Sequence, residues 1–309
     1  MDKKTLNEMS VIVKTDKPAI KEQGVTLLIP AHNEEGGIAA VINDAKAALI
    51  PYLNNDPSRF EVFVVDDAST DATAQIAKDC GATVWTNKEN LGYGASLKAG
   101  LRRAKFENII ITDGDDTYPA EVMPTMLDML ENCDQVVGAR TGANVHIPWE
   151  RKHAKIVLRK FAEYLACRKI DDLNSGLRAF KRDDALRFKN LYPAGFSFST
   201  TITLAYLSND LEIQYLPIDY RKRVGKSKLR PIRDTKNLFM TVFRCTIFFN
   251  PMRVAWPLTC LLSLIGLLVL LFARDSHGNI LDSTVMLIAC ITIQVLLVGF
   301  IADLFARSR

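Results

Sequence analysis

Residues 108–116 read NIIITDGDD, an apolar and β-branched run that ends in a cluster of carboxylates. Such a run is typical of a buried strand followed by a loop. Similar runs lie at Val25–Ile29, Glu61–Val65, Thr83–Thr86 and Gln135–Gly138. The stretches between them have the length of helices and cover 36–50, 71–80, 93–105 and 120–132. Strands that alternate with helices predict an α/β fold, a mainly parallel sheet with helices on both faces. Residues 139–233 are less regular, with a predicted helix at 151–168 and a predicted strand at Glu212–Leu216.

Polar side chains follow three of the predicted strands. The first strand leads into Pro30–Glu34, the second into Asp66–Asp67 and the fourth into Asp113–Asp116. Ligands of open α/β sheets bind beyond the carboxyl ends of the strands. A single aspartate there often caps a helix, and Asp71 fits that role. Capping does not explain three clusters at one edge, so we expect a polar ligand there.

Asp113 and Asp115 are spaced to hold a hard divalent cation that also contacts a diphosphate. A GxGxxG loop directly after the first strand is missing from the sequence, and so is GxxxxGK[ST]. This disfavours dinucleotide hydride transfer and P-loop hydrolysis. The segment Asn90–Ser96 either approaches a phosphate or sugar through backbone amides or is simply the loop that begins a helix.

The C-terminal quarter is apolar and points to a membrane. Ala255–Ala273 and Thr284–Ala302 contain no charged residue, and each can cross about 30 Å of hydrocarbon as a helix. The polar turn 274–283 would join them into a hairpin, and arginines flank the hairpin on the side of both chain ends. This asymmetry predicts that both ends are cytoplasmic. Residues 235–253 fit an amphipathic helix in the membrane interface, or one that packs on the globular domain.

Composition excludes several other classes. The 309 residues include 39 Lys and Arg against 35 Asp and Glu, a net charge of +4, which gives no reason to expect a nucleic-acid partner. Six cysteines without a CxxC pair and four histidines without an HExxH pattern disfavour disulfides and zinc or histidine metal centres. Residues 1–24 have no apolar segment long enough for a secretory signal, so we expect a loosely ordered leader.

If the ligand reacts with a second molecule, an acceptor, the chemical class of that acceptor depends on whether the protein offers a base. An alcohol must lose a proton to attack, and Asp171 with Asp172 is the only local candidate for that task. A phosphate monoester is already anionic and needs mainly Arg and Lys to hold it. The segment 221–233 is rich in Lys and Arg and has no acidic residue. Beside a membrane hairpin, it favours a lipid-borne phosphate over a merely solvated loop.

Six motifs in order resemble those of family 2 glycosyltransferases, and more narrowly those of polyprenyl-phosphate and dolichyl-phosphate sugar transferases. They are IPAHNEE (29–35), VVDDASTD (64–71), NLGYGAS (90–96), TDGDDTYP (112–119), DLNSGLRAF (172–180) and RVGKSK (223–228). With the two apolar runs, the chain is most similar to bactoprenol-phosphate glucosyltransferases over about residues 25–306.

The resemblance implies a GT-A fold, which is Rossmann-like, with a nucleotide-sugar donor, Mg²⁺ or Mn²⁺, and inversion at the anomeric carbon. It implies a donor site made of Pro30, Ala31, Asn33, Glu34, Asp66, Asp67, Asn90, Gly92, Gly94, Asp113, Gly114 and Asp115. Asp113 and Asp115 would be metal ligands and catalytic residues, with Asp115 closer to the metal. The acceptor phosphate would lie against Arg140, Ser175, Arg178, Arg223, Ser227 and Lys228, and Arg223 would also be catalytic. His32 stands where the family often has Tyr, which leaves the contact to the base open, and Asp116 adds a carboxylate at a variable position.

We therefore expect an integral protein of the cell or inner membrane that glycosylates an undecaprenyl-type polyprenyl phosphate. UDP-glucose is the favoured donor, ahead of UDP-N-acetylglucosamine and GDP-mannose. The predicted parts are a leader (1–24), a GT-A domain (25–233), an interfacial helix (234–253) and a two-helix anchor (254–309). A homo-oligomer is compatible with this organisation. The alternatives are a glycosyltransferase that acts on a glycan or saccharide hydroxyl, and a non-catalytic module that binds nucleotide or lipid. The intact DxD pair and the basic segment speak against the module.

Overall fold

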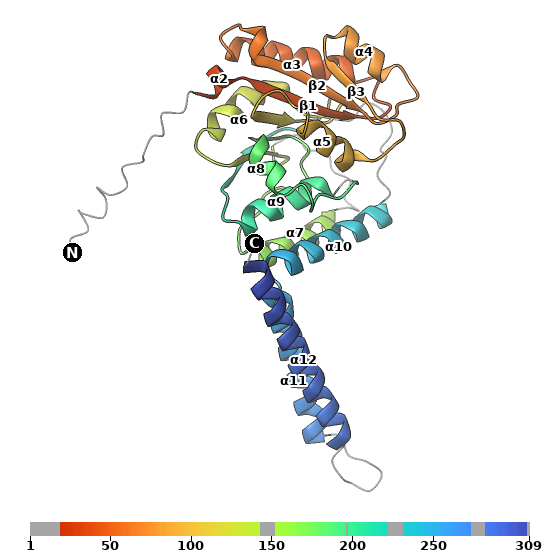
Figure 1. The fold of residues 1–309 in the computed structure, drawn as a ribbon, viewed down its shortest axis with the longest axis vertical. Coiled ribbons are helices and arrows are strands. Elements are labelled where there is room, and N and C mark those ends of the chain that lie inside the picture. Colours follow the sequence, from red (N-terminus) through yellow and green to blue (C-terminus); the bar gives the residue numbers. More distant parts are fainter. Residues whose placement is uncertain (1–18, 143–151, 196, 222–230, 273–281, 308–309) are drawn as a thin grey trace, which may run out of the picture.

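The computed structural model describes residues 19–142, 152–195, 197–221, 231–272 and 282–307 (Figure 1). Its strands form one seven-stranded sheet with the order β3-β2-β1-β4-β6-β5-β7. Their bounds are β1 (Val25–Ala31), β2 (Phe60–Asp66), β3 (Thr83–Thr86), β4 (Asn108–Ile111), β5 (Gln135–Ala139), β6 (Arg178–Lys181) and β7 (Ile213–Pro217). All neighbouring strands are parallel except those beside β6, which runs antiparallel to β4 and β5. The predicted α/β class with a mainly parallel sheet is confirmed.

β6 was not predicted, and its direction matters for the site. Arg178, its first residue, pairs with Ile111 at the end of β4 and with Val137 near the end of β5. An antiparallel strand begins where its parallel neighbours end. The segment that precedes β6 therefore arrives at the same sheet edge as the loops after β4 and β5.

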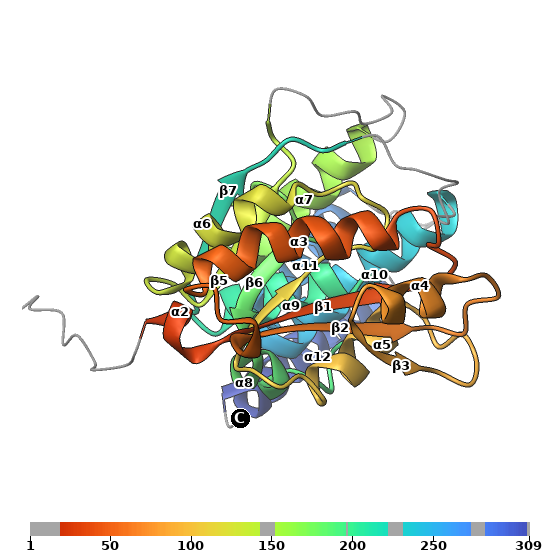
Figure 2. The same cartoon turned by 90° about the horizontal axis from the view of Figure 1, so that it is seen from above.

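Helices cover both faces of the sheet (Figures 1 and 2). One face carries α3 (Ile38–Tyr52), α4 (Thr73–Asp79) and α6 (Met123–Leu130), and the other carries α5 (Tyr93–Leu101) and α9 (Phe198–Ser208). Consecutive residues of β1 divide between the two cores: Leu27 packs in the same cluster as Ile42, and Leu28 in the same cluster as Leu97. This alternation follows from the two-residue period of a strand. The short elements are η1 (Pro57–Arg59), η2 (Ala120–Val122) and α8 (Arg182–Arg187).

A third helical layer lies beneath α9 and consists of α7 (Lys152–Ala166) and α10 (Pro231–Phe249) (Figure 1). Val242 and Cys245 of α10 are buried in one cluster with Leu158 of α7. The predicted helix at 235–253 thus begins earlier and ends before Pro251. One face of α10 packs on the globular domain, and its other face exposes Met240, Phe243 and Ile247.

The C-terminal hairpin is formed by α11 (Met252–Phe272) and α12 (Asp282–Arg307), which project together away from the domain (Figure 1). The most apolar 18-residue stretch has a mean hydropathy of 2.4 within Met252–Phe272 and of 2.7 within Ser283–Ala306, and both segments are long enough to cross a membrane. Their large side chains are mostly exposed, among them Leu264, Leu268 and Leu297. Both expected apolar helices are therefore present, and both are candidate membrane spans. Most of the turn predicted at 274–283 lies outside the described residues.

The N-terminal boundary differs from the expectation. Residues 1–18 lie outside the described part of the chain, but α2 (Ile20–Gln23) belongs to the domain. Ile20 is buried in the core beside α3 and α6, and its backbone N–H donates to Glu131 Oε1 at 3.2 Å. The leader predicted over 1–24 therefore does not extend as far as Ile20, because an apolar side chain there completes the core.

Candidate active site

The loops after β1 and β2 are tied to each other. Asn33 has a φ of +52°. Its N–H donates to Ser69 Oγ at 2.9 Å, and its Oδ1 accepts from Thr70 N at 2.8 Å. The N–H of Glu34 donates to Thr73 Oγ1 at 2.8 Å. Asn33 and Glu34 thus shape this edge of the sheet through the chain's own hydrogen bonds.

Pro30 and Ala31 differ from the expectation that they line a nucleotide. Both belong to β1 and are buried, Pro30 opposite Val65 and Ala31 opposite Asp66. Their side chains therefore pack inside the protein. Any contact of these two residues with a ligand would have to come from the backbone at the end of the strand.

Asp67, in the VVDDASTD motif, accepts hydrogen bonds from the NLGYGAS segment, a connection that neither motif predicts by itself. Its Oδ1 accepts from Asn87 Nδ2 at 2.8 Å and from Leu91 N at 2.9 Å, and its Oδ2 accepts from Gly92 N at 2.8 Å. Its backbone carbonyl lies 2.8 Å from His32 Nδ1. Asp67 therefore holds the Asn90–Gly92 segment against the end of β2. Its neighbour Asp66 is also buried and accepts from Ser69 N at 3.3 Å.

The glycine-containing segment does not form a free phosphate cradle. The amides of Gly94 and Ala95, at the start of α5, both donate to the carbonyl of Ala194, at 2.7 and 3.1 Å. A Cβ on Gly92 would lie 2.7 Å from that carbonyl oxygen, and a Cβ on Gly94 would collide with Pro193 O. Together with Asp67, these contacts occupy the amides of residues 91, 92, 94 and 95. Of the two readings of this segment, the structure supports the loop that begins a helix.

The DxD pair follows β4 at the same edge. Asp115 is buried, and its Oδ1 accepts from Thr117 Oγ1 at 2.6 Å. Asp113 receives a hydrogen bond from the Tyr93 hydroxyl, whose pKa is raised well above its usual value by burial and by this carboxylate. Behind Asp113 lies the backbone of Gly176, where an added Cβ would be 2.8 Å from Asp113 Oδ2. Asp113 thus lies between α5 and the segment that precedes β6.

Asp113 and Asp115 fit a Mg²⁺ or Mn²⁺ ion that is shared with a ligand. Both offer hard carboxylate oxygens from one short loop. Among the described residues, no group of three or more His, Cys, Asp or Glu side chains could hold a metal on its own. A protein that supplies one or two carboxylates and leaves the other positions to phosphate oxygens and water is the usual arrangement for Mg²⁺. Gly114, between the two aspartates, lies against Glu34 and Ile38.

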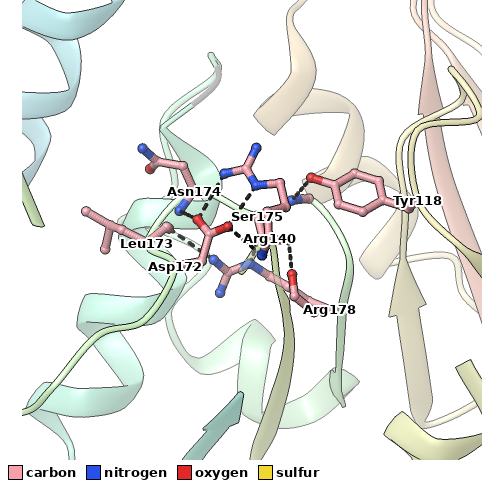
Figure 3. Close-up of polar contacts among 9 residues, drawn as sticks. Tyr118, Arg140, Asp172, Leu173, Asn174, Ser175 and Arg178 are labelled. Carbon is pink, nitrogen blue, oxygen red and sulfur yellow. Dashed lines mark hydrogen bonds and ion pairs between the residues drawn. The ribbon is translucent and has the colours of Figure 1, made fainter. Parts of the chain in front are cut away.

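Arg140 and Asp172 form the strongest ion pair of the site (Figure 3). Asp172 Oδ2 accepts from Arg140 Nε at 2.7 Å, and Oδ1 accepts from Nη2 at 2.9 Å. Burial alone would raise the pKa of Asp172, but the charge and hydrogen bonds of Arg140 outweigh it and lower the pKa to about 2. The carboxylate is therefore ionised at neutral pH and already engaged on both oxygens.

Ser175 and Arg178 were expected to contact the acceptor phosphate, but both are buried. Ser175 is buried, and its hydroxyl donates to Gly138 O at 2.6 Å. The guanidinium of Arg178 is buried and donates to the carbonyls of Ser175 and Leu173 and to Thr203 Oγ1. The expectation that Arg178 contacts the acceptor phosphate is therefore wrong for this arrangement. Arg178 instead ties the 172–178 segment to α9 through Thr203. Figure 3 shows its bonds to Leu173 and Ser175.

The basic segment begins beside the DxD loop. Arg221 N donates to Thr117 O at 3.0 Å, and its Nη1 lies 3.3 Å from Asp116 Oδ1. Tyr220 packs edge-on against Tyr118, and the Arg140 guanidinium lies over the Tyr220 ring at 5.3 Å. Arg223, Ser227 and Lys228 lie outside the described residues, so their roles stay predictions.

Several tyrosines at the site were not among the expected site residues. Tyr118 lies in the TDGDDTYP motif, and its hydroxyl accepts from Gly176 N at 2.7 Å. Tyr93 lies in the NLGYGAS motif, so position within a motif could have pointed to both. Tyr220 lies outside all six motifs, and only its place before the basic run sets it apart.

Comparison with known proteins agrees with this geometry. A family model described as glycosyl transferase family 2 matches residues 26–189, more than half of the chain. Low-salt glycan biosynthesis hexosyltransferase Agl6 of Haloferax volcanii is 32% identical over 68% of this chain and 51% of its own length. The chain thus spans about half the length of that relative. Dolichyl-phosphate hexose transferase of the same organism is 30% identical over 67% of this chain and 87% of its own length.

A solved structure shares the fold. Glucosyl-3-phosphoglycerate synthase from Mycobacterium tuberculosis, in complex with Mn²⁺, uridine diphosphate and glucosyl-3-phosphoglycerate, superposes with a TM-score of 0.53. It is 20% identical, and the match covers 75% of this chain and 85% of that one. At this identity the likeness concerns the fold, which is the expected GT-A fold.

Proposed function

The chain belongs to glycosyltransferase family 2, and from that premise we propose that it transfers a sugar from a nucleotide-sugar donor to polyprenyl phosphate. The products are a polyprenyl-phosphate sugar and a nucleoside diphosphate. UDP-glucose is the proposed donor, with UDP-N-acetylglucosamine and GDP-mannose next. The name of the Haloferax dolichyl-phosphate hexose transferase supports an acceptor of this class.

The proposal rests on the lowered pKa of Asp172 and on its ion pair with Arg140. An alcohol acceptor needs a base that can take its proton, and a pKa of about 2 makes Asp172 a poor one. Its neighbour Asp171 lies on the surface, 3.1 Å from Lys169 Nζ. A phosphate acceptor needs no base, because its oxygen is already anionic. The pairing of Asp172 with Arg140 therefore favours a phosphate over a hydroxyl.

The bond changes are balanced without a proton transfer. An oxygen of the acceptor phosphate forms a bond to the anomeric carbon, the bond from that carbon to the diphosphate breaks, and the configuration inverts. Asp113 and Asp115 would hold the divalent cation, which supplies positive charge for the leaving diphosphate. Arg140, whose Nε and Nη2 donate to Asp172, is proposed to orient the phosphate through its remaining N–H groups, and Arg223, Ser227 and Lys228 are proposed to join it.

A hairpin that spans the membrane would hold such an active site near a lipid substrate. α11 and α12 would anchor the chain in the bilayer with both termini in the cytoplasm. The exposed apolar residues of α10, Met240, Phe243 and Ile247, would lie in the interface beside the hairpin. An acceptor that is itself a lipid then reaches the enzyme by diffusion in two dimensions.

A pair of acceptors tests the proposal. The full-length protein in nanodiscs is incubated with Mg²⁺, labelled UDP-glucose and either a polyprenyl phosphate or the polyprenol of the same chain length. We expect label in the lipid only with the phosphate. Transfer to the polyprenol, or to a saccharide hydroxyl in preference to the phosphate, would overturn it. Labelled UDP-N-acetylglucosamine and GDP-mannose, supplied in parallel, identify the donor.

A further inference from the structure

A charged hollow of about 490 Å³ opens on the face of α7 that turns away from the core. Its lining includes four cations, Arg159, Lys160, Arg168 and Lys169, and a single carboxylate, Glu163. The side chains of Lys160, Arg168 and Lys169 are 69%, 62% and 85% exposed. None of these residues belongs to the sheet edge where the proposed reaction takes place.

The carboxylates near the hollow do not neutralise it. Glu163 lies 2.8 Å from Lys160 Nζ and 3.9 Å from Arg159 Nε, so two cations share one acid. Lys169 Nζ lies 3.1 Å from Asp171 Oδ1, and among the described residues Arg168 approaches Asp210, at 3.8 Å, whose side chain is 93% exposed. Ion pairs in such exposed positions contribute little and give way to other anions. Four cations thus face three carboxylates, Glu163, Asp171 and Asp210, and the hollow keeps an excess of one positive charge.

The hollow lies at the root of the hairpin. Arg253, the second residue of α11, donates from Nη1 to the carbonyl of Tyr164, at 2.8 Å. Trp256 follows three residues later on the same face of α11, about 4.5 Å further along the helix axis. Tyr164 and Trp256 are both exposed, at 55% and 51%. Exposed Tyr and Trp at the end of an apolar helix are typical of the lipid head-group level.

We propose that this hollow binds the phosphate groups of anionic phospholipids in the bilayer that the hairpin spans. Arg and Lys side chains at head-group depth attract acidic lipids, and two arginines can each bind a phosphate through two N–H groups. The site would fix the height and tilt of the domain above the membrane. It is independent of the sugar-transfer reaction proposed above.

Fluorescence quenching of Trp256 tests the proposal directly. Trp85 and Trp149 are replaced by Phe, and the full-length protein is placed in nanodiscs that mix phosphatidylcholine with 20 mol% phosphatidylglycerol. Either lipid is supplied in a brominated form that quenches tryptophan at contact. We expect phosphatidylglycerol to quench at least about twofold more than its share of the lipid predicts, since one well-placed cation attracts such a lipid several-fold.

Two variants of equal charge locate the effect. In the first, glutamine replaces Lys160, Arg168 and Lys169, and we expect the excess quenching to disappear. In the second, glutamine replaces three exposed cations elsewhere on the domain, Lys78, Arg102 and Lys189, and we expect the excess to remain. Quenching in proportion to lipid content in the parent protein would overturn the proposal. So would an excess that survives in the first variant, or one that inorganic phosphate at 10 mM removes without any change in ionic strength.

Discussion

Asp172 binds Arg140 at three points: the Nε at 2.7 Å, the Nη2 at 2.9 Å and the backbone N–H at 3.1 Å. Arg140 follows β5, and Asp172 lies in the segment that leads into β6. The pair thus joins the ends of two adjacent strands at the edge where the DxD loop also lies. The pair fixes the direction of the Arg140 guanidinium, and it makes the Asp172 carboxylate a poor general base.

The first prediction concerns this pair. Asp172→Asn keeps the size of the side chain but cannot hold the guanidinium as a charged fork, so the orientation of Arg140 is lost. We expect kcat/KM for polyprenyl phosphate to fall roughly 30-fold. This corresponds to a loss of about 2 kcal/mol of transition-state stabilisation, the scale of a charged hydrogen bond. The affinity for the nucleotide sugar, measured by calorimetry, should change little. Asp210→Asn, at an exposed site, serves as the control. A loss of donor affinity with unchanged acceptor kinetics would assign Arg140 to the donor diphosphate.

The same pair predicts an acid limit of stability. The folded-state pKa of Asp172 is lowered to about 2, against an unfolded value near ~3.9. A lowered pKa stabilises the folded state above the unfolded pKa, and this stabilisation is lost as the pH falls from about 4 towards 2. The stabilisation that is lost amounts to roughly 2–3 kcal/mol. Urea titrations of the purified protein between pH 6 and pH 2.5 should show a steeper acid loss for wild type than for Asp172→Asn. Parallel curves would contradict the pairing.

The metal site gives a third prediction. Asp115→Asn keeps the volume of a buried side chain and removes a charge that a hard cation needs. We expect turnover to fall by at least ~10²-fold, the range seen when charge-stabilising groups are lost. EDTA should abolish wild-type activity, and Mg²⁺ or Mn²⁺ should restore it. Full activity in excess chelator would exclude the role given to Asp113 and Asp115.

A glycine exchange tests the packing behind Asp113. In Gly176→Ala the new Cβ would lie 2.8 Å from Asp113 Oδ2, so the carboxylate has to move. We expect activity at saturating donor to fall at least ~10-fold, because small displacements in active sites are costly, with a higher metal concentration needed for half-maximal rate. Gly195→Ala is the matched control, since nothing lies within 4 Å of its added Cβ. Equal rates for the two variants would show that Asp113 does not need its present position.

Much of the fold was readable from the sequence because the strands around β1 are apolar and regularly separated by helices. α9 was not, since all its residues from Phe198 to Leu207 are buried and many are β-branched. A helix buried on all sides has no polar face and therefore no helical period to detect. β6, with the sequence RAFK, was missed because it has no β-branched residue and begins and ends with a cation.

The candidate site, like the fold, could be predicted only in part from the sequence. The motifs located Asp67, Asp113 and Asp115 at one edge, because the strand ends follow from local patterns and parallel strands end at the same edge of a sheet. They could not show that Arg178 is buried, or that Asp172 pairs with Arg140 across 32 residues of chain. Both facts depend on the antiparallel return of β6, which is a long-range contact that no local pattern encodes.

The most direct test of the central claim is the stoichiometry of the reaction in nanodiscs. Purified protein, Mg²⁺, UDP-glucose and undecaprenyl phosphate are combined, and the lipid and nucleotide products are measured together by mass spectrometry. We expect one undecaprenyl-phosphate hexose for each UDP released, with the Asp115→Asn protein as the blank. Release of UDP without a glycosylated lipid phosphate, or transfer of the hexose to a hydroxyl of an added glycan instead, would contradict it.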